Sequence, residues 1–211
     1  MDRDTAWQVI TQERLSLADL LDTLTAEEWE TPSLCAGWRV RDVAAHVALA
    51  PRPPGPWTMI VEGVRARGSF HRLNHDIAVR HAHQPTERIV EELREHAASR
   101  RLPPVTNYRN ILFDVLVHGQ DIAIPLGRER AMSPEAARAG ADRVWTMGWP
   151  FWAKRRLRGV RLVATDVDWT AGEGAEVRGP IDALLLLITG RSAALPHLTG
   201  AGVPGLTERL S

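Results

Sequence analysis

The sequence contains a single cysteine, Cys35, among its 211 residues. One cysteine excludes an intramolecular disulfide and any metal site built mainly from thiolates. Long apolar runs are missing too, since the longest, Ala183–Ile188, is far too short to cross a bilayer as a helix. The first ten residues, MDRDTAWQVI, lack the apolar core of a signal peptide. These absences predict a soluble protein of the reducing cytoplasm with no membrane partner.

Lysine is scarce, and neither sign of charge is in excess. All of the 26 basic residues except Lys154 are arginine, and 26 acidic residues balance them to a formal net charge of +0. A balanced charge gives no reason to expect nucleic acid as a partner. Arginine codons are rich in G and C, so the preference for arginine indicates a host genome of high GC content. The length suits one large domain or two modest ones.

The spacing of apolar residues predicts helices over most of the chain. Thr25 and Glu28 form a capping-box pattern ahead of Trp29, and Ser133 followed by Pro134 is typical of a helix start. The segments with helical spacing are residues 4–24, 33–50, 57–66, 70–83, 86–100, 107–125 and 133–145.

Beyond Gly159 the pattern changes. Val160–Thr165 alternates and is β-branched, which predicts a strand, and Ala175–Arg178 is a second strand joined to it by the glycine-rich turn AGEG. Pro180–Thr189 follows as an apolar helix that ends at Gly190. The sequence therefore predicts a mainly α fold, α+β overall, with a helical domain over residues 1–157 and a small α+β domain over residues 158–211.

The helix expected over Asn107–Pro125 carries ionisable groups on an inward face. Asp114 and His118 are four residues apart, so their side chains project the same way from adjacent turns. A carboxylate and an imidazole among apolar residues are costly unless they are paired or bound to a metal. His46 lies on the inward face of the helix expected within Ser33–Ala50.

His46, Asp114 and His118 together would supply two imidazoles and one carboxylate. This set suits Zn²⁺ with an open fourth position, and it also suits Fe²⁺ or Ni²⁺. Helical bundles commonly build metal sites from such residues on facing helices. Spacing alone does not separate this hypothesis from a metal-free Asp–His hydrogen bond. Asp121, one turn after His118, is either an acceptor for a ligating imidazole or a surface or capping residue.

A second histidine group competes with this set. His71 and His75 have ligand-like spacing, and His81 and His83 follow. Their neighbours in the sequence are polar, so a metal there would lack an apolar shell. We interpret these four residues as surface histidines.

Cys35 and a group of tryptophans have simpler interpretations. Cys35 has no candidate base near it in the sequence, which favours a small buried apolar residue over a nucleophile. Trp145, Trp149 and Trp152 are typical of a hydrophobic core, with the wall of a pocket as the alternative.

Three segments together resemble one known family. CAGWRVRDVAAHVA resembles the GW-x-V-x-D-x-x-x-H element of the mycothiol-dependent maleylpyruvate isomerase family, which is part of the DinB-like superfamily. FDVLVHGQDIAIPLG is similar to the later E-x-x-x-H-x-x-D element of that family, and LLLLITGRSAALPHLTG resembles its C-terminal GR segment. The matches span most of the chain, in the family's order.

The resemblance implies a DinB-like four-helix bundle with a divalent metal, preferably Zn²⁺, near one end, and a small C-terminal α+β domain. It implies that His46 and His118 are metal ligands. The third ligand of the family is usually glutamate, and here that position is Asp114, whose side chain reaches about one methylene less. Arg191 falls on the GR position, where the family has a functionally important arginine, so the resemblance predicts Arg191 as a catalytic residue.

The resemblance also implies an activity, namely a mycothiol-using S-transferase or cis–trans isomerase in which a metal-bound thiolate adds to a small electrophile. Arg191 would then hold a carboxylate of the substrate or of the thiol. The alternatives are a non-catalytic DinB-like metal-binding module and a metal-dependent hydrolase that uses water at the same site. The expected partners are a small-molecule electrophile and a low-molecular-weight thiol, and the chain is expected to be a monomer or a homodimer.

Overall fold

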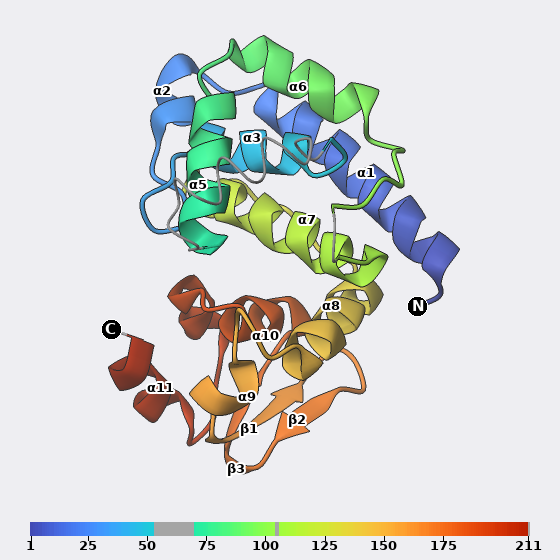
Figure 1. Ribbon diagram of the computed structural model, residues 1–211. Helices are drawn as coiled ribbons and strands as arrows, with labels where there is room; N and C mark the ends of the chain where they lie inside the picture. Colours follow the sequence, from blue (N-terminus) through green and yellow to red (C-terminus); the bar gives the residue numbers. More distant parts are fainter. Residues whose placement is uncertain (53–69, 104–105, 211) are drawn as a thin grey trace. The chain divides into compact units, whose positions relative to one another are not determined.

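The computed structural model describes residues 1–52, 70–103 and 106–210 (Figure 1). The helix expected over residues 57–66 lies outside these ranges. The chain divides into two compact units, Asp2–Arg130 and Ala131–Ser211. The sequence predicts a first domain that ends at residue 157, whereas helices α8 (Pro134–Thr146) and α9 (Ala153–Arg156) belong to the second compact unit. The boundary between independently folding domains stays a prediction.

Helices are the regular elements in the described part of the first unit, as the apolar spacing predicts, apart from one isolated bridge between Pro32 and Arg39. Its helices are α1 (Arg3–Leu21), α2 (Ala26–Glu30), α3 (Val40–Leu49), α5 (Phe70–His81), α6 (Thr86–Glu95) and α7 (Tyr108–Ala123).

Local capping sets where these helices begin. The Asp2 side chain accepts from two backbone N–H groups at the start of α1. The predicted capping box of Thr25 and Glu28 is present and starts α2, which buries Trp29. Asn107 accepts from the first N–H groups of α7. Each such cap is worth about 1 kcal/mol to the helix.

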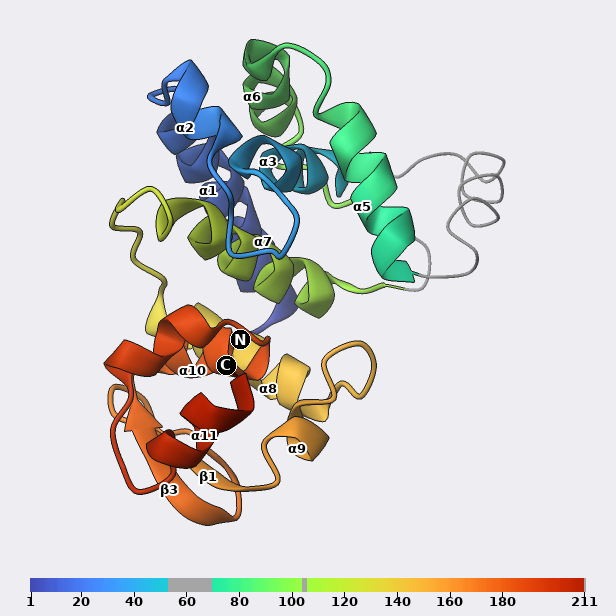
Figure 2. The same cartoon turned by 90° about the vertical axis from the view of Figure 1, so that its left-hand side faces the viewer.

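The core of the first unit forms where α1, α3, α6 and α7 meet. Helix α1 packs against α6 and α7, and α3 packs against α5, α6 and α7 (Figures 1 and 2). The side chains at the contacts are fully buried, among them Ile10, Leu17, Val43, Leu112 and Leu116. Each contributes about 1.5–3 kcal/mol by leaving water, so packing rather than helix propensity fixes the arrangement.

Arg14 interrupts the apolar stripe of α1 and is nevertheless buried, with 1% of its surface exposed. Its Nη1 donates to the backbone oxygens of Ala97 at 3.1 Å and Ser99 at 3.0 Å, just beyond the end of α6. The guanidinium thus satisfies carbonyls that a helix end leaves without partners.

A buried carboxylate joins α6 to the end of α5. Glu92 is 5% exposed and lies 2.6 Å from Nε2 of His81, while Gln84 and Arg52 also donate to it. The interpretation of His81 as a surface histidine is therefore wrong, since it is half-buried in this network. Its partners Gln84 and Glu92 lie beyond the end of α5, so helical spacing could not predict these contacts.

The Glu92→Gln substitution is expected to lower the free energy of unfolding by about 1–3 kcal/mol, because a buried ion-pair and hydrogen-bond network loses its charge. Burial raises the pKa of Glu92, but His81, Gln84 and Arg52 outweigh it and lower that pKa below 4.5. A lowered folded-state pKa stabilises the protein above the unfolded pKa, and this contribution is lost as the pH falls.

Urea denaturation at neutral pH and below pH 4.5 tests this, because the difference between wild type and variant should shrink in acid. Glu91→Gln is the matched control, since Glu91 is on the same helix but mostly exposed. It should change stability by no more than about 0.5 kcal/mol. An equal loss in both variants would show that Glu92 has no special role.

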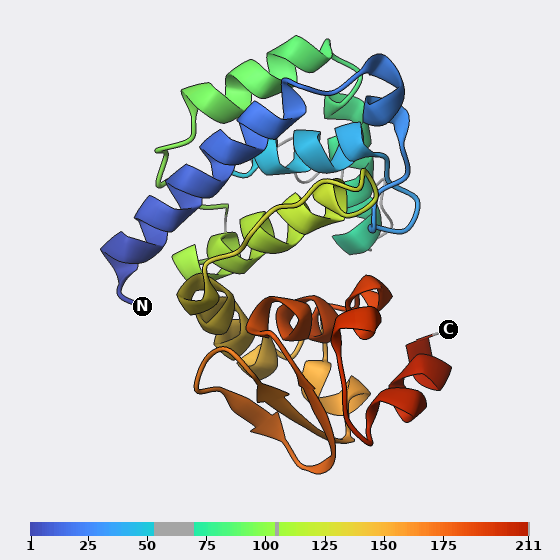
Figure 3. The ribbon, with the colours of Figure 1, turned by 180° about the vertical axis from the view of Figure 1, so that it is seen from behind.

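The second unit combines helices with a small sheet (Figure 3). Among the described residues strands begin only at Gly159, as predicted, and the mainly α fold with a small α+β part is confirmed. The elements are α8 (Pro134–Thr146), α9 (Ala153–Arg156), β1 (Gly159–Ala164), β2 (Thr170–Gly172), β3 (Gly174–Gly179), α10 (Ile181–Ile188), the 3₁₀ helix η1 (Ser192–His197) and α11 (Val203–Leu210).

The predicted link between the strands is wrong. Part of the AGEG segment belongs to a further strand, β2, which pairs antiparallel with one edge of β1, while β3 pairs parallel with the other edge. The chain passes between the two edges through Glu173, flanked by Gly172 and Gly174 at positive φ. A Cβ on Gly174 would lie 2.2 Å from a backbone oxygen of Gly159, so this crossing requires glycine.

Helix α10 forms the centre of the second unit. Its residues are almost all buried, and it packs against α8, η1 and β1 (Figures 1 and 3). Gly190 follows it at φ 99°, as the sequence predicts. The prediction that the tryptophans are core is wrong for Trp149 and Trp152, which are each 51% exposed. Trp145 is half-buried.

No helix in the described part of the chain is long and apolar enough to cross a membrane.

Candidate metal centre

The structure brings together the three side chains that the sequence singles out. His46 projects from α3, and Asp114 and His118 project from adjacent turns of α7, which packs against α3. Nε2 of His46 lies 3.7 Å from Oδ2 of Asp114, and Nε2 of His118 lies 3.5 Å from its Oδ1. One donor atom from each residue falls within 4.8 Å of the other two.

These separations fit a shared cation. Both are longer than the roughly 2.7–3.2 Å of a protein hydrogen bond. Ligand atoms about 2.0–2.2 Å from a tetrahedral zinc ion are roughly 3.3–3.6 Å apart, and each imidazole lies near that spacing from one of the two oxygens of Asp114. The three side chains are only 15–27% exposed. They are thus largely shielded from water, although each keeps some exposed surface.

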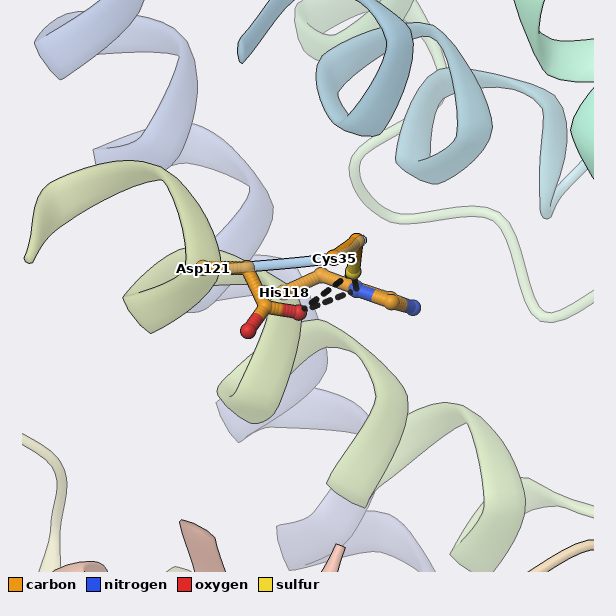
Figure 4. Close-up of side chains that lie close together, drawn as sticks. All are labelled: Cys35, His118 and Asp121. Atoms are coloured by element: carbon orange, nitrogen blue, oxygen red, sulfur yellow. Dashed lines mark hydrogen bonds and ion pairs between the residues drawn. The ribbon is translucent and has the colours of Figure 1, made fainter. Parts of the chain in front are cut away.

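Asp121 orients His118. Nδ1 of His118 lies 2.8 Å from Oδ2 of Asp121, which is completely buried (Figure 4). A carboxylate at this distance accepts a hydrogen bond from Nδ1–H, so in the neutral imidazole the lone pair is on Nε2, which lies beside Asp114. Of the two interpretations of Asp121, the structure shows the hydrogen-bond acceptor. Metal-binding histidines are commonly held by such a partner.

Cys35 forms a hydrogen bond with the same carboxylate, that of Asp121. Its thiol donates to Oδ2 of Asp121 at 3.0 Å, and its sulfur lies 3.8 Å from Nδ1 of His118 (Figure 4). The loop that carries it is fixed to α7, because the backbone N–H of Leu34 donates to the backbone oxygen of Asp121. The interpretation of Cys35 as a buried apolar residue is wrong. Its partners are 83 and 86 residues away, where local spacing carries no signal.

Trp38 covers the other imidazole. Its ring meets His46 edge-on at a centroid distance of 5.6 Å and meets His75 in the same way at 5.7 Å. The tryptophan therefore limits how the His46 ring can turn. His75, interpreted as a surface histidine, is half-buried beside Trp38 and lies 3.0 Å from Asp76. The side chain of His71 lies outside the described residues, so the competing pair stays untested.

Without a bound cation, the surroundings favour a negatively charged Asp114 and a positively charged His118. Burial raises the pKa of Asp114, but His118 and His46 outweigh it and hold that pKa well below 3.8. Burial lowers the pKa of His118, but Asp114 and Asp121 raise it well above 6.5. A metal ion that binds Nε2 of His118 must therefore displace a proton, so its apparent affinity falls as the pH falls.

Arg191 lies in the second unit, directly after the glycine that ends α10. Its Nη1 donates to the backbone oxygen of Thr189 at 2.8 Å. A second guanidinium is close, because Arg156 donates to the backbone oxygen of Leu187 at 3.1 Å. Burial lowers the pKa of Arg156, and the positive charge of Arg191 lowers it further. Two cations thus share the carbonyl end of α10, where the helix dipole favours positive charge.

The fold and these side chains define a helical unit with a candidate metal centre, followed by a small α+β unit. The sequence model of the mycothiol maleylpyruvate isomerase N-terminal domain family matches residues 10–123, more than half of the chain. The chain belongs to that family. The matched region includes the candidate ligands and the residues that contact them: Cys35, His46, Asp114, His118 and Asp121.

Two solved structures are similar to the chain over most of its length. One is the crystal structure of the mycothiol-dependent maleylpyruvate isomerase, and the other is a histidine-to-alanine mutant of that isomerase. Each shows a TM-score of 0.57 and 17% sequence identity, covering 90% of this chain and 92% of the other. At this identity the likeness shows the fold. No curated protein matches the sequence.

Proposed function

We propose that the chain is a mycothiol-dependent cis–trans isomerase or S-transferase that holds a divalent metal, preferably Zn²⁺, through His46, Asp114 and His118. The observation that carries the proposal is the spacing of these donors, at 3.5 and 3.7 Å about Asp114, within the region that matches the family. The supporting contact from Asp121 gives His118 the tautomer that a ligand needs.

The charge of this site selects its further ligand. Asp114 contributes one negative charge and the two imidazoles are neutral when they ligate, so a divalent cation and its three ligands together keep one positive charge, which attracts an anion to the metal. A divalent metal in such a site favours the thiolate form of a coordinated thiol. His46 and Asp114 each keep about a quarter of their side-chain surface exposed, and Trp38 packs edge-on against the His46 ring.

The substrate class follows from thiolate chemistry. The sulfur adds to one carbon of a conjugated cis double bond, and the π electrons move to the adjoining carbonyl. Rotation about the new single bond and expulsion of the same thiolate give the trans isomer, whereas protonation of the adduct gives a stable thioether. In this proposal Arg191 binds a carboxylate of the substrate or of mycothiol through its planar donor fork. The protein that gives the similar fold is named for maleylpyruvate, which is therefore the first substrate to assay.

Mycothiol is expected to raise the melting temperature of the metal-loaded protein and to leave the metal-free protein almost unchanged. A ligand that binds only the folded state at 100 times its Kd stabilises it by about 2.7 kcal/mol. Differential scanning fluorimetry of both forms, with mycothiol and with its disulfide as a thiol-free control, measures this effect.

Three results would overturn the proposal in different ways. A metal-loaded protein that mycothiol does not stabilise would favour the non-catalytic binding module. Turnover of an ester or amide without any thiol would favour the hydrolase. Equal stabilisation by mycothiol and by its disulfide would show binding that does not involve the sulfur.

A further inference from the structure

One face of α1 carries buried donors with no acceptor. Arg14 is 1% exposed and Trp7 is 2% exposed, and they are seven residues apart, two turns along the helix. Nε1 of Trp7 and both Nε and Nη2 of Arg14 have no hydrogen-bond partner among the described residues. Tryptophan and arginine side chains only donate, so this part of the interior requires acceptors.

Burial limits what those acceptors can be. A substrate that arrives from solvent cannot reach a side chain with 1% of its surface exposed. The Nη1 edge of Arg14 is already occupied by carbonyl oxygens beyond α6, which fixes the guanidinium in place. The Nε and Nη2 edge therefore needs an internal partner, either ordered water or a neighbouring anion.

Asp114 is an anion on α7 whose charge acts on the Arg14 guanidinium. Helices α1 and α7 pack along one another, with Arg14 and Asp114 each near the middle of its helix. Burial lowers the pKa of Arg14 to about 10, and the charge of Asp114 opposes that decrease. A carboxylate offers about four lone-pair positions, and the two imidazoles face only one on each oxygen. Asp114 therefore retains acceptor capacity.

We propose that Arg14 is a positioning residue for Asp114, which its unpaired Nε and Nη2 edge holds through ordered water in the orientation that metal binding needs. This inference rests on the proposed metal site. It identifies a support for the carboxylate ligand that is equivalent to the support Asp121 gives to His118. With that support, two of the three candidate ligands are each held by a buried charged residue.

Arg14→Met and Arg14→Lys test the inference, with Arg94→Met as the matched control. Methionine fills similar space without donors, and lysine keeps the cation but loses the planar fork. Arg94 also links α6 to α1, through Asp19 and Asp22, but at the surface. The readouts are the Kd for Zn²⁺ from competition with a chromophoric chelator, the visible spectrum of the Co²⁺-loaded protein, and the melting temperature without metal.

We expect Arg14→Met to weaken Zn²⁺ binding about 10-fold or more and to shift the Co²⁺ spectrum, as is typical when a ligand loses its supporting partner. Arg14→Lys should melt close to wild type, because it still donates to the carbonyls beyond α6, yet it should shift the spectrum in the same direction. Arg94→Met should leave both metal readouts unchanged. A crystal structure of the wild type should show water between Arg14 and Asp114.

A folded Arg14→Lys protein with wild-type Zn²⁺ affinity and an unchanged Co²⁺ spectrum would overturn the inference and leave Arg14 as a cap for the end of α6. This second variant keeps the test decisive if Arg14→Met does not fold. A wild-type protein that binds no Zn²⁺ or Co²⁺ would overturn the metal site itself, so failure of the proposed function shows before any variant is compared.

Discussion

Replacing His118 by alanine is expected to remove the metal and to abolish thiol-dependent turnover. The wild type should contain about one divalent ion per chain, because two imidazoles and one carboxylate supply three of four tetrahedral positions. His118 contributes a nitrogen whose tautomer Asp121 fixes, and without it the site keeps only His46 and Asp114. Elemental analysis of purified protein, together with an assay of maleylpyruvate isomerisation in the presence of mycothiol, measures both effects.

His83→Ala is the matched control, since His83 is exposed at the end of α5 and should keep full metal content. A His46→Ala/His118→Ala double variant that still binds one equivalent of metal would place the site elsewhere in the chain. The test thus separates the proposed centre from the surface histidines of the same unit.

Arg191→Lys is expected to lower turnover on the order of 10–100-fold, with the melting temperature and metal content nearly unchanged. The loss of a charged hydrogen bond in a bidentate pair costs about 1.5–3 kcal/mol, which corresponds to that factor in rate. Lysine retains a cation at the carbonyl end of α10, where the interaction with the helix dipole is worth about 0.3–1 kcal/mol. It loses the planar fork that matches a carboxylate.

Arg178→Lys is the control within the same unit, because Arg178 is exposed on β3 and pairs with Glu176. Steady-state kinetics of both variants, with calorimetry alongside, separates the two roles. If Arg191→Lys turns over substrate at the wild-type rate, Arg191 acts as a structural cation at the end of α10, and its assignment as a catalytic residue must be withdrawn.

Local patterns in the sequence predict the elements of this fold well. Apolar spacing and caps such as Thr25 with Glu28 depend on neighbours three or four residues away, so they are visible without tertiary structure. Strand β2 was not predictable in this way, because three residues that end in glycine carry no strand pattern. Its pairing and the parallel register of β3 depend on how the chain crosses at Glu173.

The residues of the candidate site likewise fall into those that local spacing predicts and those that only the tertiary structure reveals. Asp114 and His118 lie one turn apart on one helix, so their joint placement is predictable from spacing, and apolar spacing also places His46 on an inward helix face. The family resemblance then marks His46 and His118 as metal ligands. Cys35 and Arg14 become interpretable only in three dimensions, because their partners come from α7 and from the segment after α6. For Arg14 the sequence does give one indication of burial, because the arginine interrupts the apolar stripe of its helix. That position does not reveal which groups the arginine binds.

The small sheet also bears on self-association. The outer edge of β3 is already occupied, since Arg178 and Thr199 exchange backbone hydrogen bonds and Gly202 donates to Glu176. The opposite edge is β2, which is three residues long. Open strand edges are templates on which other chains can polymerise, and short or covered edges suppress this. Within the described residues, the sheet therefore offers a foreign strand little to extend, which makes strand addition a poor route for joining two copies.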